Sequence, residues 1–570
     1  MADIRELIIL SPEILYGKPE SGLRLVVSSI RMAVRRAVVA SSRIVFIRKI
    51  HAAIYEVHLL LLTVIARRFE GTLAVYVTGG MGTGALNVGV SDIDFAIIGS
   101  WPEETQFTLL KIFGAITFIS PLYDSASIAQ ITTMEDLKVL AATDMYMALV
   151  YAKAGQQWRL LWGSNVLGEL PPIAFDRFAG CVAMDLRRWW NTMALVCFST
   201  GVISRDSIFR NSISFKVIAE ILRAEQALSG SIPHDSRREM LERESKTSRD
   251  EIVGILVDCA DRQFLSIAAD PRPATMQWLL KHAELFHKQI SSTSYFLPSR
   301  SVTIEGSAAE VLLTHESVDH ARSIVACAQR EWSTLRGAWL VPALTFMSPD
   351  GLALVLEPGA GNVPSLAALQ RVCGEHLRGR NQTPQRIRLY LLLEQAAYQL
   401  DTGDGLELPH YTFTPATSPD VFAALGKEEF LLFGEPRLTL AQLGWSAFAH
   451  EVALEELAAR RGAYARFGIH SRPKLLNNLR NFWRLLQLWI VERSAAEGNA
   501  CLAISVQAIC RCTARWIPGA KSDLEALHPI FLLALNGQQV DEGLANACID
   551  RIYSVIQADE KEGSTGHPVP

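Results

Sequence analysis

The feature of this chain that most constrains its fold is a glycine-rich segment that runs straight into an apolar strand. Residues 77–99 read VTGGMGTGALNVGVSDIDFAIIG, and Asp92 and Asp94 are separated by one residue where the apolar run begins. The hydrophobic pattern predicts one strand over 74–80, which ends in the loop, and the next strand over 92–98. On a strand both carboxylates lie on one face, about 6–7 Å apart. Two such charges repel each other unless a cation compensates them.

The composition is that of an ordinary globular protein. Of the 570 residues, 49% are hydrophobic and 20% are charged, and the net charge is −4. These values argue against a disordered chain and against wholesale binding to a polyanion, and the length suffices for about two to four domains. The N-terminal residues lack the order of a signal peptide, and the longest apolar stretch, residues 59–66, is too short to span a bilayer. We therefore expect a cytoplasmic protein without a membrane partner.

The residues around the aspartate pair supply what phosphate chemistry needs. Mg²⁺ is a hard cation that proteins hold through one or two carboxylates together with substrate phosphates. Gly79 and Gly80 allow backbone N–H groups to approach phosphate oxygens, because no Cβ stands in the way. Thr83 and Ser91 add hydroxyl donors. A glycine loop followed by paired carboxylates therefore indicates metal-assisted phosphoryl or nucleotidyl transfer.

The order of these parts resembles the signature of the DNA-polymerase-beta-like nucleotidyltransferases. In that family a hydrophobic strand, a Gly-Gly or Gly-Ser pair, a loop and an Asp-x-Asp strand follow one another. Here eleven residues, 81–91, separate Gly80 from Asp92. The resemblance implies that Asp92 and Asp94 bind Mg²⁺. It also implies that a nucleoside triphosphate, expected to be ATP, binds at Gly79, Gly80 and the loop.

A second element fits the same resemblance. The pattern predicts a long helix over residues 205–230, with Ser212 and Lys216 near its start. In the family a helix of this kind carries a lysine that reaches the triphosphate, and the resemblance implies this role for Lys216 together with Ser212. The alternative interpretation is an ordinary exposed lysine on a helix.

The resemblance also implies a third carboxylate on a later strand, which would help to deprotonate the attacking hydroxyl. The strand predicted over 127–134 contains no acid, and Gln130 lies where the carboxylate is expected. Three explanations stay open. Asp124 folds into the site, Asp185 from the helical region serves instead, or the site binds nucleotide and metal with little or no catalysis.

Periodicity predicts the remaining elements. In the first half we expect two helices within 23–69, a helix over 105–113, a strand over 115–120, one helix over 135–155 that stops at its glycine, and helices over 175–286. In the second half we expect strands and one helix over 300–360, with a hairpin around residues 349–351, and helices over 364–556 apart from a loop at 401–420.

Basic segments and cysteines leave alternatives open. Residues 457–491 contain no acid but six arginines, Lys474 and interleaved aromatics, which would suit phosphate contact and base stacking. The alternative is a helical domain whose aromatics pack inward while its arginines are solvated. Residues 24–49 and 376–388 are weaker basic segments. The nine cysteines show no metal-ligand spacing, so we expect reduced core thiols and no zinc site.

We predict an α+β fold, with a small mixed-sheet nucleotidyltransferase core followed by helical domains and a small α/β insert. The predicted boundaries place the N-terminal helices and the core at 1–170 and a helical domain at 171–295. The insert follows at 296–362, and a C-terminal helical domain at 363–570.

The predicted function is Mg²⁺-dependent transfer of a nucleoside monophosphate from a nucleoside triphosphate to a hydroxyl or phosphate acceptor. The acceptor would be a small molecule or an RNA. Two alternatives stay open. One is a degenerate nucleotidyltransferase that acts as a nucleotide-binding or interaction module, which the missing third acid favours. The other is a synthase of a nucleotide second messenger, which would use a second nucleotide as acceptor.

Overall fold

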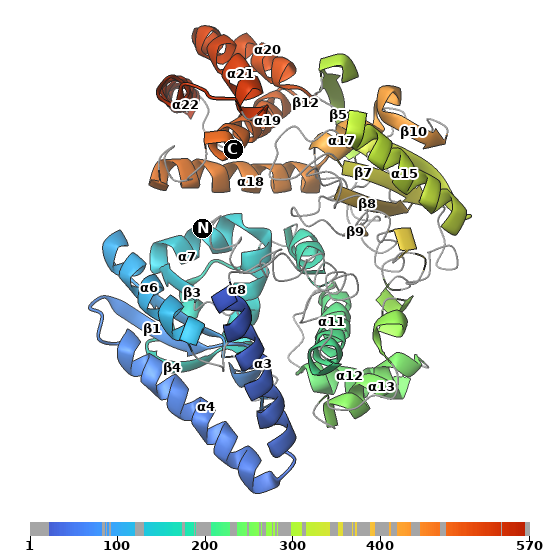
Figure 1. Cartoon of the computed structure of the whole chain (residues 1–570). Coiled ribbons are helices and arrows are strands. Elements are labelled where there is room, and N and C mark those ends of the chain that lie inside the picture. Colours follow the sequence, from blue (N-terminus) through green and yellow to red (C-terminus); the bar gives the residue numbers. More distant parts are fainter. Residues whose placement is uncertain are drawn as a thin grey trace. The chain divides into compact units, whose positions relative to one another are not determined.

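The computed structural model divides into two compact units, Asp3–His282 and Ala283–Pro570, and each is described by itself (Figure 1). The residues that the structure describes are 22–82, 86, 88–89, 93–119, 130–173, 177–186, 189, 207–228, 236–247, 250–261, 264, 270–275, 277–279, 282, 298–310, 315–341, 351–356, 368, 371–372, 388–393, 410–411, 419–434, 445–467, 475–536 and 538–564.

The first unit begins with helices around a four-stranded mixed sheet, which confirms the predicted α+β core. Strand order is β3-β2-β1-β4; β1 is antiparallel to both neighbours, and β3 runs parallel to β2. The elements are α3 (Gly22–Ser41), α4 (Val45–Ala66), β1 (Thr72–Val77), α5 (Gly79–Gly82), β2 (Phe95–Gly99), α6 (Glu103–Ile119), β3 (Gln130–Thr133), α7 (Met134–Thr143), α8 (Met145–Gln157) and β4 (Arg159–Gly163).

The two central strands bury both faces of the sheet, because successive side chains point to opposite sides. The side chains that join the core formed with α4 and α6 are Val75, Val77, Phe95 and Ile97. The side chains that join the core formed with α7 and α8 are Ala74, Tyr76, Ala96 and Ile98. With helices on both faces, the strands read as apolar runs, which is why the sequence identified them.

The strand predicted over 115–120 is wrong. Helix α6 continues to Ile119, well past the predicted end of its helix at residue 113. Leu109 and Phe113 are both buried in the core formed with α4, and their spacing of four places them on one apolar side of the helix. The β-branched and aromatic residues that follow favour a strand locally, and packing against the sheet overrides this preference.

The single helix predicted over 135–155 is two helices. Asp144 separates α7 from α8, and its carboxylate accepts a hydrogen bond from the Met147 N–H at 2.9 Å. This is an N-cap, which satisfies an amide that the new helix would otherwise leave unpaired. Gly155 does not stop α8, which continues to Gln157, and the strand β4 that follows was not predicted.

The apolar stretch 59–66 is part of a longer helix, α4. Its 22 residues are long and apolar enough to cross a membrane by length and composition, although a helix on a protein core can share both properties. Its exposed apolar side chains recur at helical spacing and include Phe46, Ile50, Ile54, Val57 and Leu61. The absence of a membrane partner stays a prediction.

The rest of the first unit is helical, as predicted for 175–286 where the structure describes it. Residues 177–186 are helical, and α11 (Ser207–Ala227), α12 (Arg237–Thr247) and α13 (Glu251–Asp261) follow. A short 3-10 helix, η1 (Val166–Glu169), links β4 to this region. Most of α11 is buried, including the polar Asn211 and Ser212.

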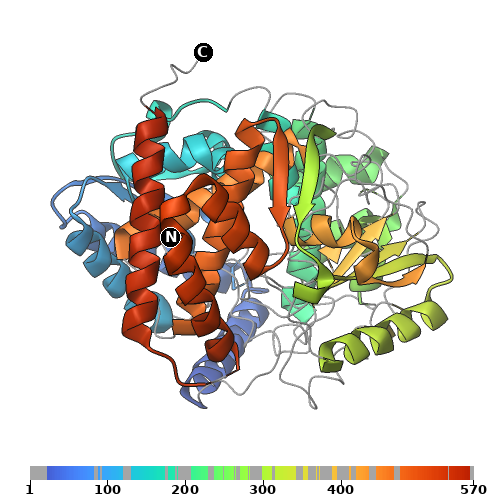
Figure 2. The same ribbon diagram turned by 90° about the horizontal axis from the view of Figure 1, so that it is seen from above.

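The second unit contains two further sheets. The five-stranded sheet has the order β10-β6-β7-β8-β9, and the three-stranded sheet has the order β11-β5-β12. Figure 2 shows β12 beside β5, with which it pairs in parallel. The strands and helices are β5 (Pro298–Glu305), α15 (His315–Glu331), β6 (Leu335–Val341), β7 (Gly351–Leu356), β8 (Arg388–Leu393), β9 (His410–Tyr411), α17 (Pro419–Leu425), β10 (Leu431–Gly434), β11 (Trp445–Ser446), α18 (Ala447–Phe467), α19 (Leu475–Ala496), β12 (Asn499–Ala503), α20 (Val506–Trp516), α21 (Lys521–Leu535) and α22 (Glu542–Ser564).

The predicted strands of residues 300–360 are confirmed, and β6 pairs antiparallel with β7 as the hairpin prediction required. The prediction of helices for 364–556 outside the loop 401–420 is wrong, because the described residues there also form the strands β8, β10, β11 and β12, while β9 falls within the predicted loop. Strand β12 reads NACLA and has little strand propensity of its own, so its pairing with β5 determines it. The boundaries at residues 170, 295 and 362 stay predictions.

Part of the basic segment 457–491 lies in the core of the second unit. Phe482 and Trp483 are fully buried, so they offer no face on which a base could stack. The buried Arg484 lies 2.8 Å from Glu456 and 3.2 Å from Asp420. Burial would raise the pKa of Glu456, but the neighbouring arginines outweigh it and lower this pKa strongly. These two aromatics thus pack inward as the alternative predicted, whereas this arginine is paired and buried.

Candidate active site

The candidate site lies where β1 ends and β2 begins. The Thr78 N–H donates to the Asp94 carbonyl at 2.8 Å, which extends the pairing of the two strands by one residue. One turn of helix, α5, then starts at Gly79, and the Gly82 N–H closes it onto the Thr78 carbonyl at 3.1 Å. The two glycines predicted to bind phosphate therefore lie at the strand end that faces Asp94.

Gly79 is required by its backbone and by its neighbour. Its φ of +61° lies in the left-handed region, which residues with a Cβ rarely adopt. A Cβ at this position would stand only 2.5 Å from Oδ2 of Asp94. The carboxylate therefore rests directly against the backbone of the glycine turn, as a site that gathers phosphate and metal would require.

The side-chain alternation predicted for this strand is confirmed. Ile93 and Phe95 are buried in the core formed with α4 and α6, while Asp94 between them is only partly buried. Asp94 therefore shares the opposite face with Ala96 and Ile98. Asp92, Thr83 and Ser91 lie outside the described residues.

The far part of the loop is held by the N-terminal helices. The Gly89 N–H donates to the Tyr55 hydroxyl of α4 at 3.2 Å, and Val88 is buried in the same core. The α carbon of Gly89 packs so closely against Val38 and Val39 of α3 that a Cβ would clash with them. Helices α3 and α4 thus fix one side of the loop. The lone tyrosine in the apolar helix was the signal for this contact, and the sequence analysis missed it.

Gln130 occupies a position on the same face as Asp94. Gln130 pairs with Ala96 in the parallel register of β2 and β3, and paired residues point to the same side of a sheet. Its neighbour Ile131 is buried in the core on the other face, as this register requires. The Gln130 Oε1 atom is buried and has no hydrogen-bond partner among the described residues. The position expected for a third acid thus carries a buried amide, and Asp124 lies outside the described residues.

Asp185, the other candidate acid, belongs to a buried charge cluster. Its Oδ2 accepts a hydrogen bond from Lys153 of α8 at 2.5 Å, and its Oδ1 accepts one from Trp189 at 3.2 Å. Burial raises the pKa of Asp185, and the charge of Lys153 opposes this rise. Both carboxylate oxygens are occupied, so Asp185 is held as a structural partner of Lys153.

Glu220 of α11 completes this cluster. Its carboxylate lies 2.7 Å from Arg237, 3.2 Å from Arg223 and 3.8 Å from Lys153. Burial alone would raise the pKa of Glu220, but these three cations outweigh it and lower the pKa to about 2. Sequence reasoning missed Lys153 and Glu220. A single lysine in the apolar helix MYMALVYAKAG was the signal for a buried partner.

Ser212 and Lys216 lie one turn apart on α11, and Glu220 follows one turn later. Residues four apart share a helix side, so Lys216 lies on the side of α11 that carries the cluster with Lys153. Ser212 is buried and Lys216 is partly buried, which differs from the ordinary exposed lysine of the alternative interpretation.

One comparison with known proteins matches the part of the chain that contains this site. Residues 60–138 match the sequence model of a family described as "Nucleotidyltransferase domain". A comparison with curated proteins gives no match. Among solved structures, the chain is similar to the spectinomycin adenyltransferase AAD(9) from Enterococcus faecialis, crystallised with ATP and spectinomycin. The identity is 13% and the TM-score 0.26, over 37% of this chain and 91% of that chain.

Proposed function

We propose that this chain, whose residues 60–138 form a nucleotidyltransferase domain of the DNA-polymerase-beta-like superfamily, transfers a nucleoside monophosphate from a nucleoside triphosphate to a hydroxyl or phosphate acceptor. The observation that carries the proposal is the position of Asp94 against Gly79. A carboxylate at the start of a strand touches a left-handed glycine turn, where metal and phosphate would meet.

The donors at this position fit a hard divalent cation. A partly buried carboxylate offers oxygen, and Gly79, which has no Cβ, allows this carboxylate to lie directly against the turn. We propose that Asp94 together with Asp92 holds Mg²⁺. When bound, the cation neutralises charge that develops on the phosphates and on the pyrophosphate leaving group.

The chain's own residues would bind and orient the substrates. Gly79 and Gly80 present backbone N–H groups to the phosphates, and Thr83 and Ser91 add hydroxyl donors. Lys216 would contact the triphosphate from α11. The acceptor oxygen attacks the α-phosphorus in line, a new P–O bond forms, and the bond to pyrophosphate breaks. We propose ATP as the nucleotide and a small molecule or an RNA as the acceptor.

A second candidate function is nucleotide binding without catalysis. The buried Gln130 amide favours it, because an amide can accept a hydrogen bond but cannot remove a proton. The two candidates share the same loop and the same Asp94. They differ in whether label leaves the nucleotide.

The test is to incubate the full chain with each α-labelled nucleoside triphosphate, Mg²⁺ and separate pools of RNA and small molecules. We expect the label to appear in one acceptor pool, and to stay in the nucleotide with an Asp94→Asn variant of unchanged circular dichroism. Tight nucleotide binding without transfer to any pool would establish the second candidate. Absence of nucleotide binding by the wild-type chain would overturn both.

A further inference from the structure

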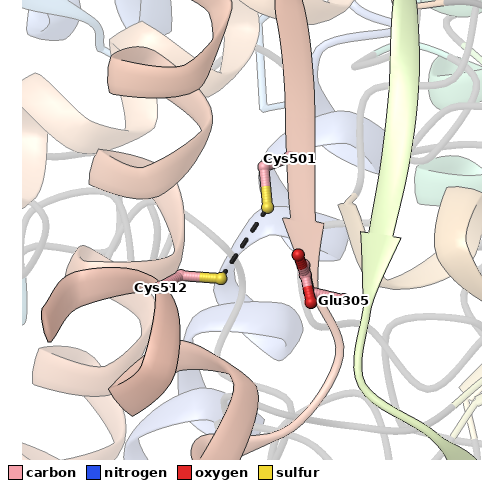
Figure 3. A group of neighbouring side chains, drawn as sticks. All are labelled: Glu305, Cys501 and Cys512. Atoms are coloured by element: carbon pink, nitrogen blue, oxygen red, sulfur yellow. Dashed lines mark hydrogen bonds between the residues drawn. The ribbon is translucent and has the colours of Figure 1, made fainter. Parts of the chain in front are cut away.

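Three potential metal ligands meet at the end of β5 in the second unit, far from the candidate active site in sequence. They are Glu305 of β5, Cys501 of β12 and Cys512 of α20, and their ligand atoms all lie within 4.8 Å of one another. Figure 3 shows the three side chains pointing toward one another. Cys501 and Cys512 are almost completely buried, and Glu305 is partly buried.

The sheet register explains how these residues meet. In the parallel pairing of β5 and β12, Glu305 lies beside Ala503 and Thr303 lies beside Cys501. Alternate residues of a strand share a face, so Cys501 and Glu305 project from the same side of the sheet. Helix α20 then places Cys512 against this side, with its Sγ 3.8 Å from the Sγ of Cys501.

The backbone around the cluster is held firmly. The Cys501 N–H donates to the Ser494 hydroxyl at 2.8 Å, and the Ile504 N–H donates to the Glu305 carbonyl at 3.0 Å. Ser505 caps α20 by accepting from the Ala508 N–H at 2.9 Å. A strand pair and a capped helix thus position all three ligands, which is how a preorganised metal site is built.

The distance between the two sulfurs fits a tetrahedral ion. With a Zn–S bond of about 2.3 Å, two thiolates on one tetrahedral zinc lie about 3.8 Å apart. The sulfurs of a disulfide are bonded at about 2.05 Å, so the observed 3.8 Å separation is far beyond a bond. The two thiols lie within hydrogen-bond distance of each other, and an ion that replaced their protons would fit the same separation.

The local charges also balance around a divalent cation. Two thiolates and one carboxylate would carry three negative charges in a largely buried place, which is costly unless cations compensate them. Arg515 lies 3.4 Å from the Glu305 carboxylate and balances one of these charges. A divalent ion would balance the remaining two. The nearby Glu310 is engaged by Arg511 and Ser505 and stands apart from this set.

We propose that Glu305, Cys501 and Cys512 bind a Zn²⁺ ion, with water as the fourth ligand. Two thiolates with a carboxylate suit zinc better than magnesium, because sulfur is a soft ligand. On binding, each thiol releases its proton to solvent and forms an S–Zn bond. The ion would link β5 to β12 and α20, which follow β5 about two hundred positions later in the sequence. The described cysteines are free thiols, as predicted, and the proposed ion differs only from the prediction of no zinc site.

Cys510 provides a matched control. It stands two residues before Cys512 on the same helix, but its Sγ lies 4.0 Å from the Leu524 carbonyl and outside the ligand cluster. The same Cys→Ser change at 510 and at 512 therefore compares a partly buried sulfur outside the cluster with a buried sulfur inside it.

The test uses the full chain, expressed with added Zn²⁺ and purified under reducing conditions. Elemental analysis should find about one zinc per chain in the wild type and in Cys510→Ser, since a largely buried site with two thiolates holds its metal through purification. Cys501→Ser and Cys512→Ser should lose it. Loading with Co²⁺ should give a sulfur-to-cobalt charge-transfer band in the first two proteins only.

A third variant keeps the proposal testable if the cysteine variants fail to fold. Glu305→Gln retains the side-chain shape, and it should keep the wild-type circular dichroism while it releases zinc to a weaker chelator. Three results would overturn the proposal. They are a wild type with free thiols and no zinc, a Cys501–Cys512 disulfide found by alkylation and mass spectrometry, and equal zinc loss in Cys510→Ser and Cys512→Ser.

Discussion

Two regions of the chain place a carboxylate at one terminus of a strand, and they differ in burial and in the ligands beside it. At the start of β2, Asp94 is partly buried and lies against the backbone of Gly79 at a glycine loop. At the end of β5, Glu305 stands beside two thiols that are almost fully buried. The first region offers oxygen and backbone amides, which suit a metal that accompanies a substrate. The second offers sulfur in a largely buried place, which suits a resident ion.

The comparison indicates that the burial of the ligands decides whether a region affects the reaction or the stability of the fold. A substrate must enter and leave the first region, so its ligands stay accessible and contribute little to folding. The second region is enclosed by β12 and α20, so an ion there stabilises the folded chain in proportion to its affinity. Changes in the first region should therefore alter the reaction, and changes in the second should alter the free energy of unfolding.

Metal removal should give the largest effect and should separate the two regions directly. A strong chelator is expected to abolish nucleotidyl transfer and to lower the thermal unfolding midpoint. Mg²⁺ added back should restore transfer but leave the midpoint low, whereas Zn²⁺ should restore the midpoint but not transfer, since each region has ligands for one ion. Labelled transfer and a thermal scan measure both. If one ion alone restores both properties, the comparison fails.

Asp94→Asn should come next and should act on the reaction alone. Loss of a single electrostatic donor from an active site costs ~10²–10³-fold in rate, and a metal ligand should cost at least as much. The unfolding midpoint without metal should stay the same or rise, because a carboxylate near Asp92 no longer repels it. Initial rates of labelled transfer measure the change. Wild-type rates in this variant would remove Asp94 from the site.

The first region could be predicted from the sequence because its residues are close together. The alternation of Ile93, Asp94 and Phe95 is a local pattern of period two, and the structure confirms which of them join the core. The glycines stand within a few positions of the strand they precede. Strand periodicity and turn chemistry act over this range, so the sequence carries the information.

The second region could not be predicted in this way. Cys501 and Glu305 meet only because β12 pairs with β5, and NACLA gives no local sign of that pairing. The prediction of a strand over 115–120 failed for the same reason, since packing on the sheet decides that α6 continues to Ile119. The break at Asp144 is different. An aspartate three residues before the capped amide of Met147 is a local signal that sequence reasoning could have used.

Lys153→Met should test whether Asp185 is scaffold or a third acid of the first region. The change leaves two buried carboxylates with one cation fewer, which should cost ~3–5 kcal/mol in the free energy of unfolding. Lys138→Met, which removes an exposed pair with Glu169 at 3.4 Å, should cost ~0–1 kcal/mol and is the control. Denaturant unfolding measures both.

The pH dependence of the free energy of unfolding of Lys153→Met tests whether Asp185 is the group left unpaired. The pKa of Asp185 is raised by burial, and loss of Lys153 removes the charge that opposes this rise. A raised carboxyl pKa means that the folded state holds the proton longer than the unfolded state, so stability falls as pH rises through the folded pKa. The variant should therefore recover part of its loss on acidification toward the ordinary pKa of an aspartate. A loss that is independent of pH would show that Asp185 is not the group left unpaired.

Gly79→Ala should give a smaller and more local effect. A non-glycine residue in the left-handed region costs roughly 1–2 kcal/mol. The new Cβ would also stand 2.5 Å from Oδ2 of Asp94, so the carboxylate must move. We expect a weaker affinity for nucleotide with Mg²⁺ and a slower transfer. Gly155→Ala lies in α8 with nothing within 4 Å of its Cβ, and should stabilise by roughly 0.5–1 kcal/mol. Equal nucleotide affinity in Gly79→Ala and wild type would place the phosphate loop elsewhere.

Gln130→Glu should have the smallest effect if the proposed transfer is right. The position lies beside Ala96 on the face of Asp94, and its Oε1 is buried without a described partner. Burial should raise the pKa of the new carboxyl, and a third negative charge disturbs a site that already works with another base. A catalytic chain should therefore gain nothing or lose modestly in rate. A chain that only binds nucleotide should instead bind Mg²⁺ more tightly and gain slow transfer, up to the ~10²–10⁴-fold that a general base contributes. Single-turnover transfer with wild type and Gln130→Glu side by side distinguishes the two. A gain of that size would favour the binding module over the enzyme.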